Sequence, residues 1–324
     1  MTFSRRDTLK LFAGAAAAAT FAPVLPALAQ ATELRIGWQK GGVFALAKAS
    51  GAIDKWLAPL GITVSWNEFT SGPPLLEALG ANALDFGATG DIPPLFAQAA
   101  GGDLLYVAAS KGAVDGSAIL VKQDSPIQSI ADLKGKKVAF KRGSSSHNFA
   151  VKALRTAGLG LGDIEALDLG PPDAAPAFAN NQIDAWVIWD PYFAIAQQQP
   201  DTRVLATTEG IVDSWSYYLG NGSYTKANPQ VIAQVIDELA KVGAAAQANL
   251  DETVDDISAV TGIPVDIQKV ALTRKGADLG AIQPLDDTIL AYQQALADEF
   301  FDLKIIPAKL DIKSAFWIAP KVEG

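Results

Sequence analysis

Residues 34–41 read Leu-Arg-Ile-Gly-Trp-Gln-Lys-Gly, an alternating apolar segment that runs into a glycine turn. This pattern predicts a short strand followed by a helix over residues 43–52. A similar segment recurs when residues 35–41 are aligned with residues 137–143, Lys-Val-Ala-Phe-Lys-Arg-Gly, at an offset of 102 residues. The fold is therefore decided by a strand–glycine–helix unit that occurs twice.

A second internal match points to the same division of the chain. Residues 78–91 align with residues 177–190 at an offset of 99, with matched asparagine and aspartate positions. Because βα units share a common composition, coincidence explains either match alone equally well. Two matches at nearly the same offset favour two lobes of similar construction.

The rest of the chain alternates short apolar runs with helical patterns, which is typical of parallel βα units. Residues 116–122 predict a strand that enters the second lobe, and residues 214–219 predict a strand that leaves it. The C-terminal part is predominantly helical and is expected to return to the first lobe. We therefore expect an α/β fold with residues 30–115 and 220–324 in lobe I and residues 116–219 in lobe II. The two crossing segments would act as a hinge beside an interlobe cleft.

The N-terminus has the pattern of an export signal. A basic region at residues 5–10 precedes an apolar run, and Ala27-Leu28-Ala29 supplies a small-residue cleavage pattern. Residues 4–10 are similar to a twin-arginine (Tat) signal, although Thr8 stands where that pattern prefers Phe. An ordinary Sec signal that contains two arginines is the alternative. Either route predicts a cleaved signal peptide over residues 1–29 and a periplasmic protein.

Composition excludes several classes of site. The 324 residues include no cysteine and one histidine. They therefore lack disulfides, a cysteine-based zinc site, a thiol nucleophile and a lipid-modified N-terminal cysteine. A formal net charge of −9 disfavours nucleic acid and anionic membranes as partners. We expect a freely diffusing monomer without a metal or cofactor.

Four turns at the ends of predicted strands are candidates for a binding site, because ligands of parallel α/β sheets bind where strands end and helices begin. A helix N-terminus presents unpaired N–H groups and a partial positive charge, which suits an anion. Glycine permits close approach of the backbone to a ligand, and serine adds a hydroxyl donor. The candidate binding residues are Gln39, Lys40, Gly41, Thr89, Gly90, Asp91, Gly143, Ser144, Ser145, Ser146, His147, Trp189 and Asp190, with Trp215 from a later segment.

Most of these candidates also have a structural explanation. One serine of residues 144–146 suffices as a helix cap, and the other two would then face solvent. Lys40 and Arg142 could simply be surface charges beside strands, but Lys40 precedes a diglycine and is the better candidate for the site. Asp91 and Asp190 lie just before proline and are equally well explained as helix caps. As site residues, the two carboxylates would suit a substrate amine or would orient donors that face an anion.

Aromatic residues near the turns are candidates for apolar walls around an alkyl chain. Trp38, Trp189 and Trp215 are such candidates, although core packing is the more common role of Trp. Trp186 lies three positions from Trp189 in a strand, so only Trp189 is expected in the cleft. His147 cannot build a multi-histidine metal site alone, and we interpret it either as a donor at the cleft edge or as a helix-surface residue.

At these positions the chain resembles the aliphatic sulfonate-binding proteins of ABC uptake systems, over nearly all of the sequence after the signal. The resemblance is densest in residues 34–41, 89–99, 138–148 and 184–192. It implies a type II periplasmic binding protein fold with two α/β lobes, a hinge and an interlobe cleft. It also implies capture of alkanesulfonates for sulfur metabolism and delivery to an ABC permease in the inner membrane.

Related families of this fold bind taurine, nitrate, bicarbonate or heterocycles, so the fold alone does not select a ligand. The fold also hosts a desulfinase with a catalytic cysteine and a pyrimidine-forming enzyme with clustered histidines. The absence of cysteine and the single histidine argue against both enzymes. The sequence departs from the family pattern at residues 42–44 and 213–216, where the indole of Trp215 could adapt the pocket to a longer or aromatic sulfonate. We therefore expect a binding protein rather than an enzyme.

Overall fold

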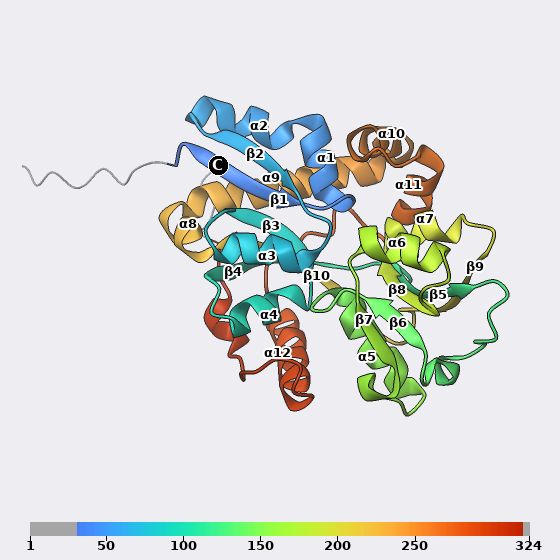
Figure 1. Ribbon diagram of the computed structural model, residues 1–324. Coiled ribbons are helices and arrows are strands. Elements are labelled where there is room, and N and C mark those ends of the chain that lie inside the picture. The colour runs from blue at the N-terminus through green and yellow to red at the C-terminus, as the bar shows by residue number, and fades with distance from the viewer. Residues whose placement is uncertain (1–30, 320–324) are drawn as a thin grey trace, which may run out of the picture. The chain divides into compact units, whose positions relative to one another are not determined.

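Two five-stranded sheets organise residues 31–319, the part of the chain that the computed structural model describes (Figure 1). The first sheet has the strand order β2-β1-β3-β10-β4, and the second has the order β7-β6-β8-β5-β9. The strands are β1 (Glu33–Trp38), β2 (Thr63–Glu68), β3 (Phe86–Gly90), β4 (Leu104–Lys111), β5 (Ser117–Lys122), β6 (Lys137–Phe140), β7 (Glu165–Asp168), β8 (Ala185–Trp189), β9 (Thr202–Thr207) and β10 (Trp215–Asn221).

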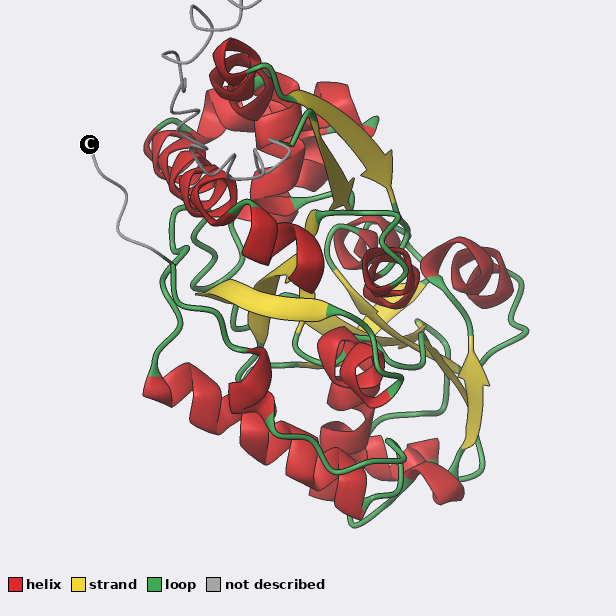
Figure 2. Cartoon of the chain, turned by 90° about the vertical axis from the view of Figure 1, so that its left-hand side faces the viewer, coloured by secondary structure: helices red, strands yellow, loops and turns green. Residues whose placement is uncertain are grey.

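Helices pack on both faces of the strands (Figure 2). The α-helices are α1 (Gly42–Ser50), α2 (Ala52–Leu57), α3 (Gly72–Gly80), α4 (Pro93–Ala99), α5 (Ser145–Thr156), α6 (Pro171–Ala179), α7 (Tyr192–Gln197), α8 (Gly222–Ala227), α9 (Pro229–Ala248), α10 (Leu250–Thr261), α11 (Val265–Leu272) and α12 (Asp287–Asp302). Short 3-10 helices are η2 (Ala58–Leu60), η3 (Ile130–Leu133), η4 (Leu161–Asp163) and η5 (Ile312–Ala315). None of these described helices is both long enough and apolar enough to cross a bilayer.

The two sheets are built to one plan. Each has three neighbouring parallel strands, then one antiparallel strand, then an edge strand. The antiparallel strand is β10 in the first sheet and β5 in the second sheet. The first internal match falls on β1 and β6, and the second leads into β3 and β8, which occupy equivalent places in the two sheets. This shared strand order agrees with the repeat found in the sequence and confirms the predicted fold class.

Strand β10 differs from the sequence expectation. Residues 214–219 were expected in lobe II, but β10 pairs with β3 and β4 of the first sheet. Its residues from Tyr217 to Asn221 are buried, so its apolar pattern fits the interior of either sheet, and only the pairing partners decide between them. The chain therefore returns to the first sheet before Trp215 rather than after residue 219.

Two segments carry the chain between the sheets. They are residues 112–116, between β4 and β5, and residues 208–214, between β9 and β10. The segments lie side by side, because the Gly112 N–H donates to the Ser214 carbonyl at 2.9 Å. Two adjacent crossings stand where the sequence predicts a hinge.

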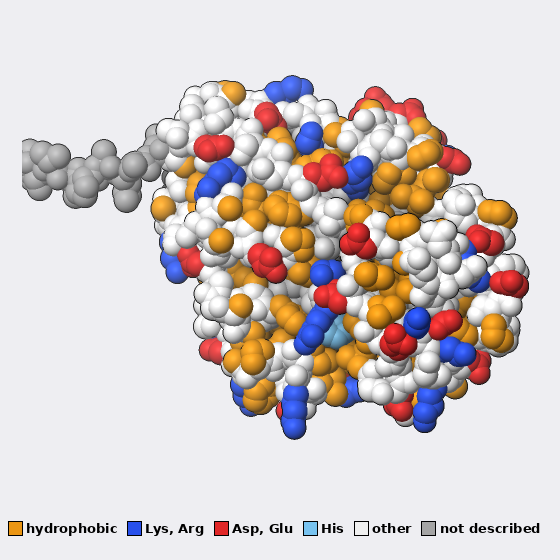
Figure 3. Space-filling model, in the orientation of Figure 1, with side chains coloured by type: hydrophobic (Ala, Val, Ile, Leu, Met, Phe, Trp, Pro, Cys, Tyr) orange, Lys and Arg blue, Asp and Glu red, His pale blue; other side chains and the backbone are white. Residues whose placement is uncertain are grey.

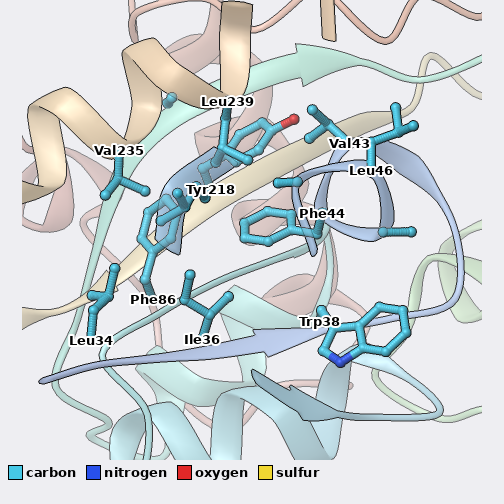
Figure 4. Packing of buried hydrophobic residues seen from close by; sticks show 14 of the residues in the cluster. Leu34, Ile36, Trp38, Val43, Phe44, Leu46, Phe86, Tyr218, Val235 and Leu239 are labelled. Atoms are coloured by element: carbon cyan, nitrogen blue, oxygen red, sulfur yellow. The ribbon is translucent and has the colours of Figure 1, made fainter. Parts of the chain in front are cut away.

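Apolar side chains of the first strands build the core beneath the site (Figure 4). Leu34 and Ile36 alternate along β1 and point to the helices, as a half-buried strand requires. Phe44 of α1 stacks on Tyr218 of β10 at a ring-centroid distance of 5.8 Å and contacts Phe86 of β3 at 5.7 Å. Burial of each aromatic ring contributes roughly 1.5–3 kcal/mol, and together these contacts fix the start of α1 above the strand ends.

The signal peptide predicted at residues 1–29 lies outside the described residues.

Candidate functional site

A cavity of about 350 Å³ lies at the strand ends of both sheets. Its walls include the turns after β1, β3, β6 and β8, the crossing segments, and the C-terminal residues around α11. The carboxyl ends of the parallel strands thus converge on one hollow, which is the arrangement expected of a ligand site in this class of sheet.

Ten of the fourteen candidate residues line this cavity, namely Gln39, Lys40, Gly41, Thr89, Gly90, Ser144, Ser145, Trp189, Asp190 and Trp215. The other four, Asp91, Gly143, Ser146 and His147, do not line it. The structure therefore brings together candidates from both lobes, and it places a smaller group behind the wall.

The first lobe contributes the N-terminus of α1. No side chain caps this helix, and Gly41 at its start has a φ of 139°, a backbone conformation that favours glycine. The N–H groups of the first helical turn have no partner within the helix, so α1 presents donors and a partial positive charge at the cavity. Lys40 adds a positive charge, which Glu68 partly offsets at 3.8 Å. Gln39 donates to the Ala88 carbonyl at 3.2 Å, which ties the ends of β1 and β3 together.

The second lobe contributes the N-terminus of α5. Ser144 occupies the cap position in extended conformation, yet its side chain donates to the Lys141 carbonyl at 2.7 Å rather than capping the helix. Ser146 is fully buried and lies 2.8 Å from the Ser144 hydroxyl, so it supports the turn from behind. Ser145 lines the cavity and closely approaches Gly90 of the first lobe, where an added Cβ would lie 1.8 Å from the Ser145 Oγ. The two lobes therefore contact each other at the site.

Asp190 lines the cavity as half of an ion pair. Arg274, between α11 and α12, donates from Nε to the Asp190 Oδ2 at 2.8 Å and stacks over Phe193 at 3.9 Å. The Ala194 N–H also donates to Asp190 at 3.0 Å, within the first turn of α7. Burial raises the pKa of Asp190, while the contact with Arg274 lowers it. The Asp190 side chain therefore helps to position this wall of the cavity. No local sequence pattern predicted its partner Arg274, which lies 84 residues away.

Asp91 lies behind the cavity, in a hydrogen-bonded cluster that joins the lobes. It is fully buried, and its Oδ2 accepts hydrogen bonds from Asn148 Nδ2 at 2.9 Å and from the Tyr292 hydroxyl at 2.8 Å. Gln293 donates to the Asp91 carbonyl at 2.7 Å. Burial raises the pKa of Asp91 to about 6, although the hydrogen bonds from Tyr292 and Asn148 lower it. Asp91 does not line the cavity, and Ile92 rather than Asp91 occupies the cap position of α4. The third predicted role of Asp91, orienting donors that face an anion, stays a prediction.

His147 is a buried residue rather than a donor at the cleft edge or a surface residue. Its ring stacks on Phe140 at 5.1 Å and meets Phe300 edge-on at 5.6 Å. The Gly143 N–H donates to its Nδ1 at 3.3 Å. Burial, followed by the nearby charge of Arg142, lowers the pKa of His147 to about 4, so the ring is neutral near pH 7.

Aromatic and C-terminal residues complete the walls. Trp189 meets Tyr192 edge-on at 6.2 Å, and both line the cavity with Trp215. Sequence reasoning missed the contribution of the C-terminal part of the chain. Gln268, Ala271 and Leu272 of α11 and residues 277–279 of the loop that follows line the same cavity. The only signal of the α11 residues is the helical spacing of an amphipathic segment, which does not reveal which residues face a site formed by distant strands.

Ion pairs bridge the lobes on the side of α5 and α12. Lys152 donates to Glu299 at 2.6 Å, and Arg155 pairs with the same carboxylate.

Acidic and basic side chains are interspersed over the face that Figure 3 presents. The net negative charge of the chain therefore does not exclude an anion from this cavity, since helix N-termini and Lys40 supply donors there.

Comparison with known proteins gives one consistent result. A family model described as NMT1/THI5 like matches residues 52–253. A relative in Escherichia coli (strain K12) that is named for aliphatic sulfonate binding is 38% identical over 321 residues, covering 98% of this chain and 99% of that protein.

Two solved structures are similar over most of their length. The alkanesulfonate-binding protein SsuA from Xanthomonas axonopodis pv. citri bound to MOPS has a TM-score of 0.83 at 35% identity, covering 89% of this chain and 99% of that one. The periplasmic aliphatic sulphonate binding protein SsuA from Escherichia coli has a TM-score of 0.80 at 38% identity, covering 91% and 95%.

Proposed function

The chain belongs to the NMT1/THI5-like family, and from this premise we propose that it is a periplasmic solute-binding protein that captures alkanesulfonates for uptake. The solute would pass to an ABC permease of the inner membrane, and the binding protein would act as a monomer without catalysis. The relatives that carry the words sulfonate-binding and periplasmic in their names support both the ligand class and the location.

One observation carries the proposal: two helix N-termini, from opposite lobes, meet at one cavity without side-chain caps. The start of α1 brings backbone N–H donors after Gly41, and the start of α5 brings those after Ser144 together with the Ser145 hydroxyl. A sulfonate has three oxygens that share one permanent negative charge, so donors on two sides satisfy it when the lobes meet.

The energetics of such a site are sufficient for capture. Each charge-assisted hydrogen bond contributes roughly 1.5–3 kcal/mol, so about six of them exceed the roughly 8 kcal/mol of micromolar binding before association costs. The one acidic side chain among the candidate residues at this cavity, Asp190, is paired with Arg274 and therefore does not repel an anion strongly.

A thermal-shift panel followed by calorimetry tests the proposal. We expect stabilisation by linear alkanesulfonates, and weaker or no stabilisation by taurine, nitrate, carboxylates and heterocycles. Stabilisation by nitrate or a carboxylate without any by sulfonates would assign the site to another ligand class. Release of sulfite from a sulfonate by the purified protein would instead make it an enzyme.

Paired variants locate the site. Replacing Ser145 by Ala should weaken sulfonate binding about tenfold, because Ser145 lines the cavity and its hydroxyl donor is lost. The exposed Ser314→Ala change is a matched control and should leave affinity unchanged, since its hydroxyl bonds locally to the Asp311 carbonyl. Equal affinities in all variants would show that the ligand binds elsewhere.

A further inference from the structure

Among the described residues, four with charged side chains line the cavity, two of each sign. They are Lys40, Lys111, Asp190 and Asp278. The side chains of Lys40 and Lys111 are 33% and 57% exposed, and Asp278 is exposed as well, whereas the Asp190 side chain is only 15% exposed. Solvent screens an exposed charge more strongly than a buried one, so the Asp190 carboxylate has the largest influence on a nearby anion. The charge balance of the cavity therefore depends on what neutralises Asp190.

The turn that carries Asp190 lies against the start of α1. Its next residue, Pro191, also lines the cavity, and a Cβ added to Gly41 would lie 3.5 Å from the Pro191 Cδ. Gly41 occupies the cap position of α1, whose first N–H groups are the donors proposed above for the sulfonate. An unpaired negative charge on this turn would therefore oppose the binding of an anion at those donors.

Arg274 supplies the neutralising charge from behind the wall. Its Nε donates to the Asp190 Oδ2 at 2.8 Å, and its Nη2 donates to the Asp190 Oδ1 at 3.3 Å. The Arg274 side chain is 10% exposed, and the residue does not line the cavity. The guanidinium therefore acts on a ligand through Asp190 rather than by contact.

Several contacts fix the position of Arg274. Its Nη2 also donates to the Gln197 Oε1 at 2.9 Å, and the guanidinium stacks over the Phe193 ring at 3.9 Å. The next residue is fixed as well, because the Lys275 N–H donates to the Asp115 carboxylate in the first crossing segment at 2.9 Å. All of these partners belong to the protein, so the ion pair does not need a ligand to form.

We propose that Arg274 sets the affinity for anions by neutralising the Asp190 carboxylate at the wall of the cavity. Arg274 is thus a positioning residue that balances charge. This inference rests on the function proposed above and identifies a residue that determines the selectivity of the same site. It requires the two members of one ion pair to have opposite effects, since loss of Arg274 exposes the ligand to a negative charge and loss of the Asp190 charge does not.

Calorimetry with propanesulfonate tests this opposition. Arg274→Met should weaken binding about tenfold, because it leaves the Asp190 charge unpaired beside the anion. Arg274→Lys keeps the positive charge and should bind within about threefold of the wild type. Asp190→Asn removes the negative charge and should bind at least as tightly as the wild type. The double variant that combines Asp190→Asn with Arg274→Met should recover to within about twofold of the wild type.

Lys269→Met is the matched control. It removes a positive charge from α11, in an exposed ion pair with Asp251, and it should leave the affinity unchanged. Circular dichroism checks that each variant is folded, because Arg274→Met leaves a buried charge unpaired. If Arg274→Met does not fold, Asp190→Asn and the double variant still decide the question. Tenfold weaker binding in both of them would mean that the ion pair only supports the structure, and it would overturn the proposal.

The pH dependence of binding gives a measurement that a purely structural role would not change. Burial raises the pKa of Asp190, the contact with Arg274 lowers it, and the nearby charge of Asp115 raises it. In Arg274→Met the carboxylate should therefore take up a proton more readily, and the affinity should recover as the pH falls from 8 to 5 while the sulfonate stays ionised. The double variant corrects for other titrating groups, Asp91 among them. A ratio of the two affinities that stays constant with pH would contradict the proposal.

The outcomes distinguish this inference from the function on which it rests. Tight binding of propanesulfonate that none of the Asp190 and Arg274 variants changes would overturn the inference while sulfonate binding stood. Binding of no alkanesulfonate to the wild-type protein, at any chain length, would overturn the proposed function and this inference together.

Discussion

Asn148 of the second lobe donates a hydrogen bond to the buried carboxylate of Asp91 in the first lobe, with 2.9 Å between Nδ2 and Oδ2. The bond lies behind the cavity, and Tyr292 of α12 bonds the same oxygen at 2.8 Å. The contact joins the two lobes, so we expect it to stabilise the arrangement in which both lobes border the cavity. We therefore expect Asp91 to affect binding through this arrangement rather than through contact with the ligand.

Asn148→Ala should weaken ligand binding about tenfold or more without unfolding the protein. The change removes a hydrogen bond to a charged group, which contributes roughly 1.5–3 kcal/mol, and it leaves Asp91 less satisfied only in the closed arrangement. Calorimetry with the best sulfonate measures the affinity, and circular dichroism checks the fold. Asn180→Ala, at an exposed position of the same lobe, is the control. An unchanged affinity in Asn148→Ala would contradict a closing role.

Asp91→Asn should change the pH dependence of stability. Burial raises the pKa of Asp91 from 3.8 to about 6, so the folded protein holds this proton more tightly than the unfolded chain does. The stabilising effect of that protonation is complete below pH 4 and is lost as the pH rises through 6. The free energy of unfolding of the wild type should therefore fall relative to Asp91→Asn by up to about 3 kcal/mol over this interval.

Denaturant unfolding at pH 4, 5, 6 and 7 measures this difference. The comparison of slopes is needed because the Asn side chain also alters the hydrogen bonds with Asn148 and Tyr292, which shifts stability at every pH. Asp173→Asn, an exposed position on α6, provides the reference for loss of a carboxylate. Parallel curves for the wild type and Asp91→Asn would show that Asp91 is not the titrating group.

His147→Phe should act with the opposite sign. Burial lowers the pKa of His147 from 6.5 to about 4, so the folded protein binds this proton less tightly than the unfolded chain. The stability that the neutral ring contributes is present above pH 6.5 and is lost as the pH falls toward 4. The variant should therefore gain stability relative to the wild type by up to about 3 kcal/mol on acidification. This effect opposes that of Asp91, so the pH dependence of the wild type alone would hide both effects. A difference in the free energy of unfolding between wild type and variant that stays constant with pH would refute the assignment.

Local sequence patterns were sufficient to predict where strands end, but not to predict which distant residues the side chains at those ends contact. The paired Asp85 and Asp184 were visible as a repeat, and each accepts a hydrogen bond at 2.8 Å from the backbone N–H at the equivalent position, Arg35 or Lys137. Such contacts occur in both lobes because the same pair of neighbouring strands occurs in both sheets. The sheet membership of β10 had no such signal, because an apolar strand fits either sheet.

The same division holds for the candidate site: its turns were predictable from the sequence, and its long-range contacts were not. The turns that contain Gly41 and Ser144 were identified because glycine and serine at helix starts have a local physical reason. The contact between Asp91 and Tyr292 spans 201 residues, and the ion pair between Asp190 and Arg274 spans 84 residues. Neither follows from spacing along the chain, since both are set by how distant elements meet.

Gly90→Ala should block the closed arrangement. A Cβ at this position would lie 1.8 Å from the Ser145 Oγ and 3.1 Å from its Cβ, far inside van der Waals contact. We expect ligand affinity to fall at least about tenfold, because the lobes must separate or Ser145 must move. Gly162→Ala is the control, since no atom lies within 4 Å of its added Cβ.

A double-mutant cycle with Ser145→Gly tests the cause of that loss. If the clash with Ser145 is responsible, Gly90→Ala should cost little further affinity in the Ser145→Gly background. An equal loss in both backgrounds would place the effect elsewhere in the first lobe.

Asp85→Ala should destabilise the protein more than Asp184→Ala, although the two residues occupy equivalent places in the repeat. The side chain of Asp85 is 3% exposed and accepts three hydrogen bonds from Arg35, two of them from the guanidinium at 2.6 and 2.9 Å. Removal of the Asp85 carboxylate leaves the Arg35 guanidinium without its ion pair and should lower the free energy of unfolding by about 3 kcal/mol. Asp184 is exposed, and its removal breaks one hydrogen bond from a backbone N–H, so it should lower the free energy of unfolding by about 1 kcal/mol. Urea unfolding of both variants measures the difference. Equal costs would mean that the backbone contact shared by both lobes, and not the ion pair found in one, carries the stabilisation.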